Sequence, residues 1–414
     1  MAYTLVEVDV TRPLNELSVR SDADGAALVL RDGPRPLGLL LLALPHGRLA
    51  PSVLDGLVVK AGAENLLEER LRRALLARDG GGDSHGVPGD RSVTVAVCTR
   101  NRPGDLDRCL DSIDRAVEAF RERVDLLVVD NAPPDDATEQ VVRGRPGVRY
   151  VRETVAGLDI ARNRALAEAR GRWLAFVDDD VRVDRWWVDG LVRAWEEHPE
   201  AAAVVGLVLP AELGTEAQIR FESRGGFGRG FVQRRWDGRQ GPGGRLHPLG
   251  AGVFGAGCNM AFDVAIVRGL GGFDEALDTG PPLPGGGDLD MFFRVLDAGL
   301  PLVYEPRMAV FHRHRRGMDE LRRQYFSWGT GFAAYLGARW TDPGERAQIL
   351  RLAAWWLNYQ RKQVMSAACK RDAVEVRMAL AELTGGGIGA LGGYQRSQRR
   401  MERRRVALVG VVRP

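Results

Sequence analysis

The sequence is poor in cysteine, has almost no lysine and contains no long hydrophobic run. Its four cysteines, at positions 98, 109, 258 and 369, form no CxxC pair and show no framework spacing. We therefore expect unbridged thiols in a reducing compartment. The apolar stretch Gly38–Leu44 is far too short to cross a bilayer, and the first ten residues lack a signal-peptide pattern. These absences predict a cytoplasmic protein.

Charge is nearly balanced, with a formal net charge of +3 at pH 7. Lysine occurs only at positions 60, 362 and 370, so almost all of the positive charge is arginine. Because nucleic-acid-binding proteins usually carry a strong basic excess, we expect no nucleic-acid partner. The composition, 45% hydrophobic and 27% charged, is ordinary for a globular protein with a large core.

The first 80 residues predict a small α+β module that shows no catalytic pattern. Leu5–Val10 alternates like a strand, and Ala26–Arg31 and Leu37–Leu44 flank a turn signal as a hairpin would. A helix is expected over residues 52–77. The simplest interpretation is a packing or docking module.

The rest of the chain divides into three further parts. Residues 81–91, rich in glycine and aspartate, are typical of a flexible linker. Residues 92–316 alternate between strand and helix patterns and are the expected catalytic domain. Residues 317–414 are predicted to be helical.

From Val93 onward the alternation of strands and helices favours a doubly wound, mostly parallel sheet. Two helices are expected to have Asp105 and Asp159 as N-caps. Short apolar runs bounded by polar residues or glycine predict four strands. They cover residues 93–98, 125–129, 148–151 and 173–177.

Polar residues follow three of these strands at the point where each strand ends. Thr99 and Arg100 follow the first, Asp130 follows the second, and Asp178–Asp180 follow the last. Parallel strands place these ends at one edge of the sheet, where ligands of open α/β sheets bind. Three adjacent carboxylates repel one another unless a cation or a base offsets their charge. We therefore expect a metal or nucleotide site here, the alternative being a solvated acidic loop.

A nucleoside diphosphate fits this edge. Asp130 and Asp178 can accept hydrogen bonds from a base or a ribose, while Arg100 and Arg162 can face phosphate oxygens. Asp180 can hold Mn²⁺ or Mg²⁺ between the phosphates, because hard cations prefer oxygen ligands. Residues 99–104 contain neither GxGxxG nor a Walker motif, which argues against a dehydrogenase or a P-loop enzyme.

Short motifs follow one another in a fixed order over residues 92–315. They are Val93–Arg102, Val128–Asn131, Gly157–Asn163, Phe176–Asp180, Gly255–Phe262, Gly271–Glu275, Gly287–Asp290 and Val310–His312. Together they resemble the family 2 glycosyltransferases of the GT-A fold. The resemblance implies a nucleotide-diphospho-sugar transferase fold, α/β with a Rossmann-like mixed sheet. It also implies inverting transfer of a hexosyl or deoxyhexosyl group from a nucleotide-sugar donor.

The resemblance assigns roles to individual residues. Asp288 matches the catalytic base, although Gly287 stands where glutamate is common. Asp180 matches the main ligand in a DxD-type metal motif for Mn²⁺ or Mg²⁺, and His312 matches a histidine that completes the metal site. His314 stays open as the alternative ligand. The residues matched to the nucleotide are Thr99, Arg100, Asn101, Asp130, Arg162, Asp178 and Asp179, and those on the sugar or acceptor side are Gly257, Asn259 and Asp290.

Two segments have two interpretations each. Residues 212–250, rich in glycine and arginine, form either a lid over the site or a disordered surface insertion. Trp355, Trp356, Tyr359 and the arginines of 396–405 form either core and a solvated face, which we favour, or a peripheral membrane or partner surface.

Other functions stay open at this stage. A nucleotidyltransferase of similar fold would release pyrophosphate, and a sugar-nucleotide-binding scaffold would bind without turnover. The sequence does not identify the sugar or the acceptor, which could be a polysaccharide, a lipid-linked glycan, a natural product or a peptide. It also leaves open a homo-oligomer.

Overall fold

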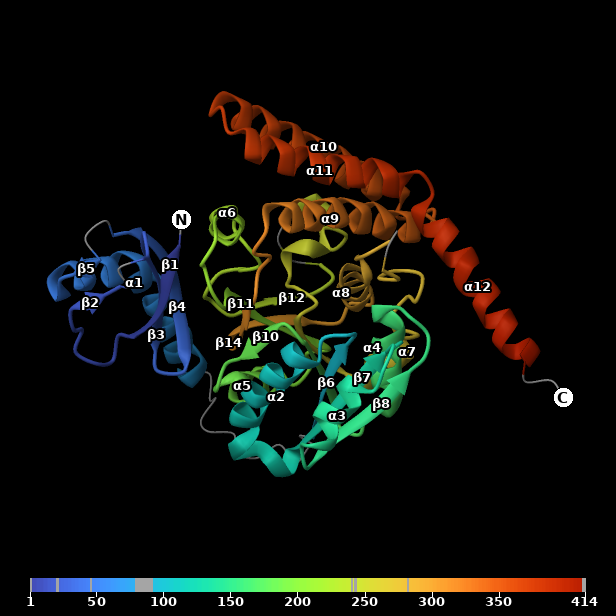
Figure 1. Cartoon of the computed structure of the whole chain (residues 1–414), viewed down its shortest axis with the longest axis horizontal. Coiled ribbons are helices and arrows are strands. Elements are labelled where there is room, and N and C mark those ends of the chain that lie inside the picture. Colours follow the sequence, from blue (N-terminus) through green and yellow to red (C-terminus); the bar gives the residue numbers. More distant parts are fainter. Residues whose placement is uncertain are drawn as a thin grey trace.

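The computed structural model describes residues 2–19, 22–44, 47–78, 92–239, 241, 244–280 and 283–411. A small N-terminal sheet lies beside a large central sheet, and a layer of long C-terminal helices covers one side of the molecule (Figure 1). The predicted linker, residues 81–91, lies outside the described residues.

The N-terminal unit is a three-stranded sheet with one long helix. Strand β1 (Tyr3–Asp9) pairs in parallel with β3 (Gly25–Asp32), which forms an antiparallel hairpin with β4 (Arg35–Ala43). Short strands β2 (Leu17–Ser18) and β5 (Arg48–Leu49) pair with each other, and α1 (Pro51–Arg78) follows. The predicted hairpin and helix are confirmed. Gly33 makes the hairpin turn at φ +56°, a conformation that side chains with a Cβ rarely adopt.

The central sheet has nine strands and is mixed. Four parallel strands lie in the order β9, β6, β7, β8, followed on the other side by β13, β11, β14 and β10, with β12 also paired to β14. Strand β13 is antiparallel to both of its neighbours. Most of these strands are apolar runs buried on both faces, which fits a sheet covered by helices on both sides. The strands are β6 (Val93–Thr99), β7 (Val124–Asn131), β8 (Val148–Glu153), β9 (Trp173–Asp178), β10 (Val181–Val183), β11 (Ala203–Pro210), β12 (Arg234–Trp236), β13 (Asn259–Asp263) and β14 (Leu302–His312).

The register of the parallel strands brings the predicted polar ends together. Thr99 of β6 pairs with Asp130 of β7, and Cys98 of β6 pairs with Asp178 of β9. At the other half of the sheet, His312 at the end of β14 pairs with Val181, one residue beyond Asp180. One edge of the sheet therefore carries these polar groups, as the alternation of strands and helices predicted.

Seven helices pack around this sheet, and two of them begin earlier than expected. Helix α2 begins at Pro103, whose fixed φ suits the first helical position, so Asp105 lies in the first turn and is not the N-cap. Helix α4 begins at Leu158, so the predicted cap Asp159 is also inside the helix. The helices are α2 (Pro103–Val117), α3 (Ala137–Arg143), α4 (Leu158–Glu168), α5 (Trp187–Glu197), α6 (Glu216–Ser223), α7 (Val264–Gly269) and α8 (Gly287–Asp297).

The segment 212–250 is neither a long structureless loop nor a disordered insertion in its described residues. It contains α6 and β12, with Phe221 and Trp236 buried. Ile219 of α6 and Leu213 pack with Ala27 of the N-terminal sheet, and the Tyr3 amide donates to the Leu213 carbonyl at 2.7 Å. Phe221 of the same helix packs with Leu321, Tyr325 and Met378, so α6 is held between the N-terminal unit and the C-terminal helices.

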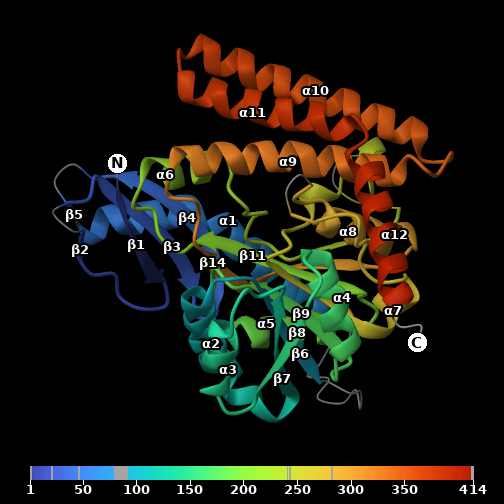
Figure 2. The same cartoon turned by 45° about the vertical axis from the view of Figure 1, so that its right-hand side comes forward.

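The C-terminal helices α9 (Met318–Arg339), α10 (Arg346–Cys369) and α11 (Ala373–Ala390) lie one above another, and α12 (Gly393–Val411) runs down the side of the molecule (Figure 2). Helices α9 and α11 approach closely because glycines line the contact. A Cβ on Gly329 would lie 2.0 Å from the Glu382 carbonyl oxygen, and one on Gly385 would lie 2.0 Å from that of Phe326.

The core interpretation that we favoured for the aromatic residues of α10 holds for Trp356, which is half-buried with its ring 5.4 Å from that of Phe332, but is wrong for Trp355 and Tyr359. Trp355 and Tyr359 stack on each other and are 49% and 42% exposed, because the face of α10 that packs on the molecule carries Leu352 and Gln360 instead. Among the described residues, none of the helices combines the length and the apolar character needed to cross a membrane.

A buried ion pair fastens the N-terminal unit to the central sheet. The Arg31 guanidinium of β3 donates to both carboxylate oxygens of Asp184, at 2.6 and 3.1 Å, and Asp184 directly follows β10. Both side chains are almost inaccessible to solvent. A Glu7 carboxylate contacts the same guanidinium at 3.0 Å. Two-point contacts of this kind fix orientation as well as distance.

Arg31→Ala is expected to lower the free energy of unfolding by about 3–5 kcal/mol, because it leaves the Asp184 carboxylate buried without its cation. Denaturant unfolding followed by tryptophan fluorescence measures the change. The matched control is Arg12→Ala, since Arg12 is 81% exposed in its pair with Asp9 and should change stability by less than about 0.5 kcal/mol. Equal stability of the two variants would contradict a docking role for Arg31.

Candidate functional site

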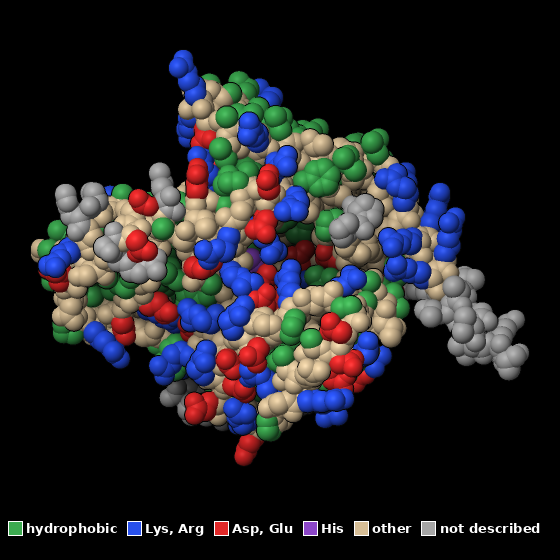
Figure 3. Space-filling view, viewed as in Figure 1, with side chains coloured by type: hydrophobic (Ala, Val, Ile, Leu, Met, Phe, Trp, Pro, Cys, Tyr) green, Lys and Arg blue, Asp and Glu red, His purple; other side chains and the backbone are tan. Residues whose placement is uncertain are grey.

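The candidate site lies at the polar edge of the central sheet. Figure 3 shows a hollow in the middle of the molecule, with acidic side chains inside it and arginine side chains around it. The residues that meet there come from the ends of β6, β7, β9 and β14 and from the start of α8. The next paragraphs follow the edge from the three aspartates to Asp288.

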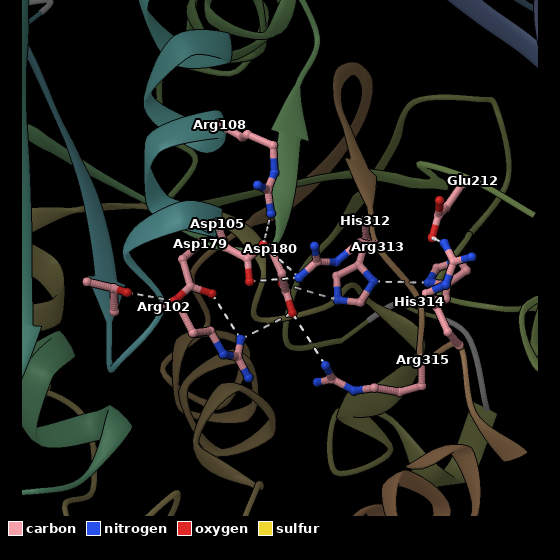
Figure 4. A network of polar contacts seen from close by, with 12 residues as sticks. Arg102, Asp105, Arg108, Asp179, Asp180, Glu212, His312, Arg313, His314 and Arg315 are labelled. Carbon is pink, nitrogen blue, oxygen red and sulfur yellow. Dashed lines mark hydrogen bonds and ion pairs between the residues drawn. The ribbon is translucent and has the colours of Figure 1, made fainter. Parts of the chain in front are cut away.

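The three aspartates after β9 have different surroundings. Asp179 accepts a hydrogen bond from Thr99 Oγ1 at 2.7 Å and from Arg102 Nη1 at 3.0 Å, which ties the loops after β6 and β9 together. Arg102 Nη1 also lies 3.3 Å from Asp180 Oδ2, and Arg315 lies 3.7 Å from the same oxygen (Figure 4). Burial, together with the neighbouring Asp180 carboxylate, raises the pKa of Asp178 to about 7. A bound cation would reverse that effect.

His312, and not His314, faces the aspartates. Its Nε2 lies 3.5 Å from Asp180 Oδ1, while its Nδ1 lies 2.9 Å from Nδ1 of His314. His314 Nε2 in turn lies 2.6 Å from a Glu222 carboxylate oxygen on α6. The four groups form a chain from Asp180 to Glu222, most of which is visible in Figure 4.

The proton positions in this chain depend on the protonation of His314. When His314 is neutral and donates its Nε2–H to Glu222, its Nδ1 accepts the Nδ1–H of His312. In that state the Nε2 lone pair of His312 is directed toward the Asp180 carboxylate. Burial lowers the pKa of His312 to about 4, which keeps this imidazole neutral at pH 7.

These residues fit a divalent cation as two of its ligands. A carboxylate and an imidazole lone pair face each other with no proton between them, which is the arrangement that a metal ion stabilises. In the described part of the chain, however, no group of three or more His, Cys, Asp or Glu side chains has metal-site geometry. Asp180 and His312 can therefore hold Mn²⁺ or Mg²⁺ only with further oxygen ligands, such as those of a bound diphosphate.

Asp130 has an unused acceptor in a buried position. Tyr150 donates to its Oδ2 at 2.9 Å, while its Oδ1 is buried and has no hydrogen-bond partner among the described residues. Burial raises the pKa of Asp130. A ligand that donates an N–H or O–H to Oδ1 would remove the cost of this unpaired group.

Asp288 lies at the start of α8, across the edge from the aspartates. Its Oδ2 accepts the Gly257 N–H at 2.9 Å, and its Oδ1 accepts the N–H of Leu289 at 2.9 Å. A Cβ on Gly257 would lie 2.8 Å from Arg162 Nη2 and 3.1 Å from Asp288 Oδ2. Glycine at 257 is therefore what allows the Arg162 guanidinium and the Asp288 carboxylate to approach the same point.

Arg162 is buried and has two carboxylate partners. Its Nη1 lies 2.9 Å from Asp159 Oδ1 and 3.4 Å from Asp278 Oδ2. These neighbours, with Asp178 and Asp288 farther away, raise its pKa despite the opposing effect of burial. Asp278 also accepts the Gly287 N–H at 3.1 Å and adopts φ +47°, which is unusual for a residue with a side chain.

The absence of a side chain at Gly287 has a steric cause. A Cβ there would lie 1.9 Å from Asp159 Oδ2, far inside van der Waals contact. Asp159 is fully buried, and its Oδ2 has no hydrogen-bond partner among the described residues. The carboxylate expected from a residue at 287 is thus present in the same place but comes from α4.

Two residues predicted on the acceptor side have structural partners instead. Asn259 is buried and donates to the Leu207 and Met308 carbonyls, at 3.0 and 2.7 Å, which ties β13 to β11 and β14. Asp290 is buried between Arg294 and Arg339 at 2.7 and 3.3 Å. These contacts give no support to an acceptor-side role for either residue.

The loop residues Arg100 and Asn101 are exposed, and Asn101 has φ +56°. Sequence reasoning did not assign roles to several residues that line the edge. Arg102 and Arg315 stand next to predicted site residues, and this proximity was the only available signal. Asp159 lies in the motif Gly157–Asn163 but was expected only as a helix cap. Glu222 and Asp278 had no signal, since their contacts depend on the packing of α6 and of the segment before α8.

Comparisons with known proteins find a family profile, relatives and a solved structure that are similar to this chain. Residues 94–266 match the sequence profile of Glycosyl transferase family 2. A pre-mycofactocin glycosyltransferase of Mycobacterium tuberculosis is 28% identical over 333 residues, which cover 78% of this chain and 62% of that protein. The succinoglycan biosynthesis protein ExoM of Rhizobium meliloti is 33% identical over 120 residues, 28% of this chain and 38% of that one.

A comparison with solved structures identifies the fold of this chain. A mannosyltransferase of Pyrobaculum calidifontis, PcManGT, in complex with GDP-Man and Mn²⁺, has a TM-score of 0.50 and 17% identity, covering 82% of this chain and 99% of that one. The GT-A fold expected from the sequence is confirmed. The chain spans about three fifths of the length of the Mycobacterium relative.

Gly287→Glu is expected to destabilise the protein by roughly 1–3 kcal/mol, because the new side chain overlaps Asp159 and forces the Arg162 pair apart. Asp159→Ser combined with Gly287→Glu should recover most of that loss, since the carboxylate is moved rather than added. Melting temperatures of the two single variants and the double variant give the coupling between the positions.

Gly269→Glu is the control for adding a glutamate, because nothing lies within 4 Å of a Cβ at position 269. A double variant no more stable than Gly287→Glu would show that the carboxylates of 159 and 287 are not interchangeable.

Proposed function

We propose, because residues 94–266 match the profile of Glycosyl transferase family 2, that the protein is a metal-dependent, inverting glycosyltransferase. It moves a sugar from a nucleotide-diphosphate donor to an acceptor hydroxyl. The observation that carries the proposal is the position of Arg162, which lies beside Gly257, the residue that binds Asp288, and whose pKa is also raised by Asp178. The Asp178–Asp180 group with a cation suits a departing diphosphate, and the Asp288 carboxylate suits a general base.

The donor side is built from the ends of β6, β7, β9 and β14. The unpaired Oδ1 of Asp130 accepts a hydrogen bond from the base or ribose of the nucleotide. Arg102 and Arg315, which lie within 4 Å of Asp180, balance the negative charge of the diphosphate. Asp180 and His312 would hold Mn²⁺ or Mg²⁺, which supplies charge stabilisation of the leaving group when bound.

The acceptor side is built around Asp288. Both of its oxygens receive backbone N–H groups, from Gly257 and Leu289, which fix the plane of the carboxylate. Each oxygen keeps a further lone pair that can accept the proton of an acceptor hydroxyl. Inversion follows if the hydroxyl attacks from the Asp288 side while the diphosphate leaves on the opposite side.

The comparisons support the class of donor. PcManGT is described in complex with GDP-Man and Mn²⁺, and a nucleotide sugar with a divalent cation is what we propose for this chain. The scaffold alternative depended on Gly287, where a glutamate was expected. Gly287 no longer favours a scaffold without turnover, because the Asp159 carboxylate occupies the space beside position 287.

Asp288→Asn is expected to reduce sugar transfer by at least about a hundredfold, because it keeps the size of the side chain and one of its two backbone hydrogen bonds but removes the base. Donor binding should stay unchanged, as measured by the melting-point shift with GDP, UDP and their sugar conjugates in the presence of Mn²⁺. The matched control is Asp180→Asn, for which the Mn²⁺-dependent shift itself should disappear. Full turnover in the Asp288 variant would sink the assignment of the base.

Glu222→Gln is expected to weaken Mn²⁺ binding by about 10–100-fold, because it removes the group that fixes the proton positions of His314 and His312. Electron paramagnetic resonance of Mn²⁺, titrated with protein in the presence of GDP or UDP, measures the affinity. Glu216→Gln is the control on the same helix, since Glu216 is exposed and pairs only with Arg220. An Mn²⁺ affinity equal to that of the control would exclude a positioning role for Glu222.

A further inference from the structure

Arg229 carries a charge that has no carboxylate partner among the described residues. Its Nη1 and Nη2 donate to the carbonyls of Gly228 and Gly252, both at 3.0 Å. Its Nε is buried and has no hydrogen-bond partner in the described part of the chain. Burial lowers the pKa of Arg229, although a guanidinium remains protonated at neutral pH. Enclosing a cation without a counter-ion costs free energy that a bound anion would recover.

Arg229 is half-buried, whereas three fully buried arginines of this protein do have acidic partners. Arg31, Arg162 and Arg307 each contact two carboxylates within 4 Å. In those cases the protein supplies its own counter-ions, as is usual for a buried guanidinium. Arg229 departs from this rule, which indicates that its counter-ion comes from outside the chain.

The position of Arg229 relates it to Asp288. The charge of the Asp288 carboxylate opposes the lowering of the pKa of Arg229 by burial, and Asp288 is itself bound by the Gly257 N–H. Gly252, which accepts from Arg229, would carry a Cβ only 3.7 Å from the Leu289 side chain. Two residues before Arg229, the Phe227 ring lies 5.0 Å from the ring of His312. The segment 227–229 thus runs from the candidate metal ligand to the side of the base.

We propose that Arg229 binds an anionic group of the acceptor, a carboxylate or a phosphate, close to the hydroxyl that receives the sugar. The proposal rests on the proposed function, because Asp288 is what defines the acceptor side. The planar fork of a guanidinium matches both kinds of anion. The hydrogen bond from Arg229 to Gly252 is exposed, so a ligand can reach this edge of the side chain.

The diphosphate of the donor is the other anion that Arg229 could bind. The two possibilities differ in where the anion lies. The proposed donor contacts are Asp180, His312, Arg102 and Arg315, at the other end of the segment 227–229. An arginine that serves the donor would change nucleotide binding. One that serves the acceptor would leave nucleotide binding unchanged.

The test is isothermal titration of the full chain with two probes in turn. GDP or UDP with Mn²⁺ reports on the donor site, and inorganic phosphate or succinate, added to the nucleotide-saturated protein, reports on the acceptor side. For Arg229→Gln we expect nucleotide affinity within about twofold of wild type and anion affinity reduced by about tenfold or more, as for loss of a charge-assisted hydrogen bond. Arg234→Gln is the control, because Arg234 is an exposed arginine of the same segment.

Equal binding of phosphate and succinate by wild type and Arg229→Gln would overturn the proposal. So would a loss of nucleotide affinity in Arg229→Gln, since it would assign Arg229 to the diphosphate. Absence of nucleotide binding by the wild-type protein would contradict the proposed function instead. In that case, anion binding that still depends on Arg229 in the nucleotide-free protein would support the anion site by itself.

Discussion

The buried guanidinium of Arg162 is the interaction on which the acceptor half of the site depends. It lies between Asp159 of α4 and Asp278 of the segment before α8. Asp278 also accepts the Gly287 N–H in the first turn of α8, the turn that contains Asp288. Carboxylates from separate segments lie close together here with little solvent. The guanidinium of Arg162 offsets the cost of their mutual repulsion and burial. The direction of Asp288 is therefore set by charge balance around a neighbouring residue as much as by its own hydrogen bonds.

The two halves of the proposed site differ in how the negative charge of their clustered aspartates is balanced. On the proposed acceptor side Arg162 pairs with Asp159 and Asp278, so the protein itself balances part of the negative charge there. On the donor side Asp178 and Asp180 face a neutral imidazole, and Arg102 and Arg315 balance them only from the periphery. The proposed donor half therefore has an excess of negative charge, which a divalent cation bound together with the diphosphate would neutralise.

The sequence predicted what depends on local pattern and strand order. The apolar runs located the strands, and their parallel arrangement explains why Thr99, Asp130 and Asp178 meet. Motifs also led to His312, Asn259 and Asp290, but a motif locates a residue without revealing its partners, and the contacts of Asn259 and Asp290 emerge only in the structure. The sequence named Asp159 only as a helix cap. The contacts of Glu222 and Arg229 could not have been found from the sequence, since they join segments that only folding brings together.

The packing of α6 has a consequence for how the chain can be divided. A flexible linker between two sheets usually marks a point where a protein can be cut into autonomous pieces. Here the N-terminal sheet supports Leu213 and Ile219, and the helix that carries Ile219 also carries Glu222, the last member of the chain that begins at Asp180. The N-terminal unit therefore supports the helix that carries Glu222, beside the proposed metal ligands. Exchanging this unit for the corresponding unit of a relative would change the position of Glu222, and with it the contact to His314, through one turn of α6.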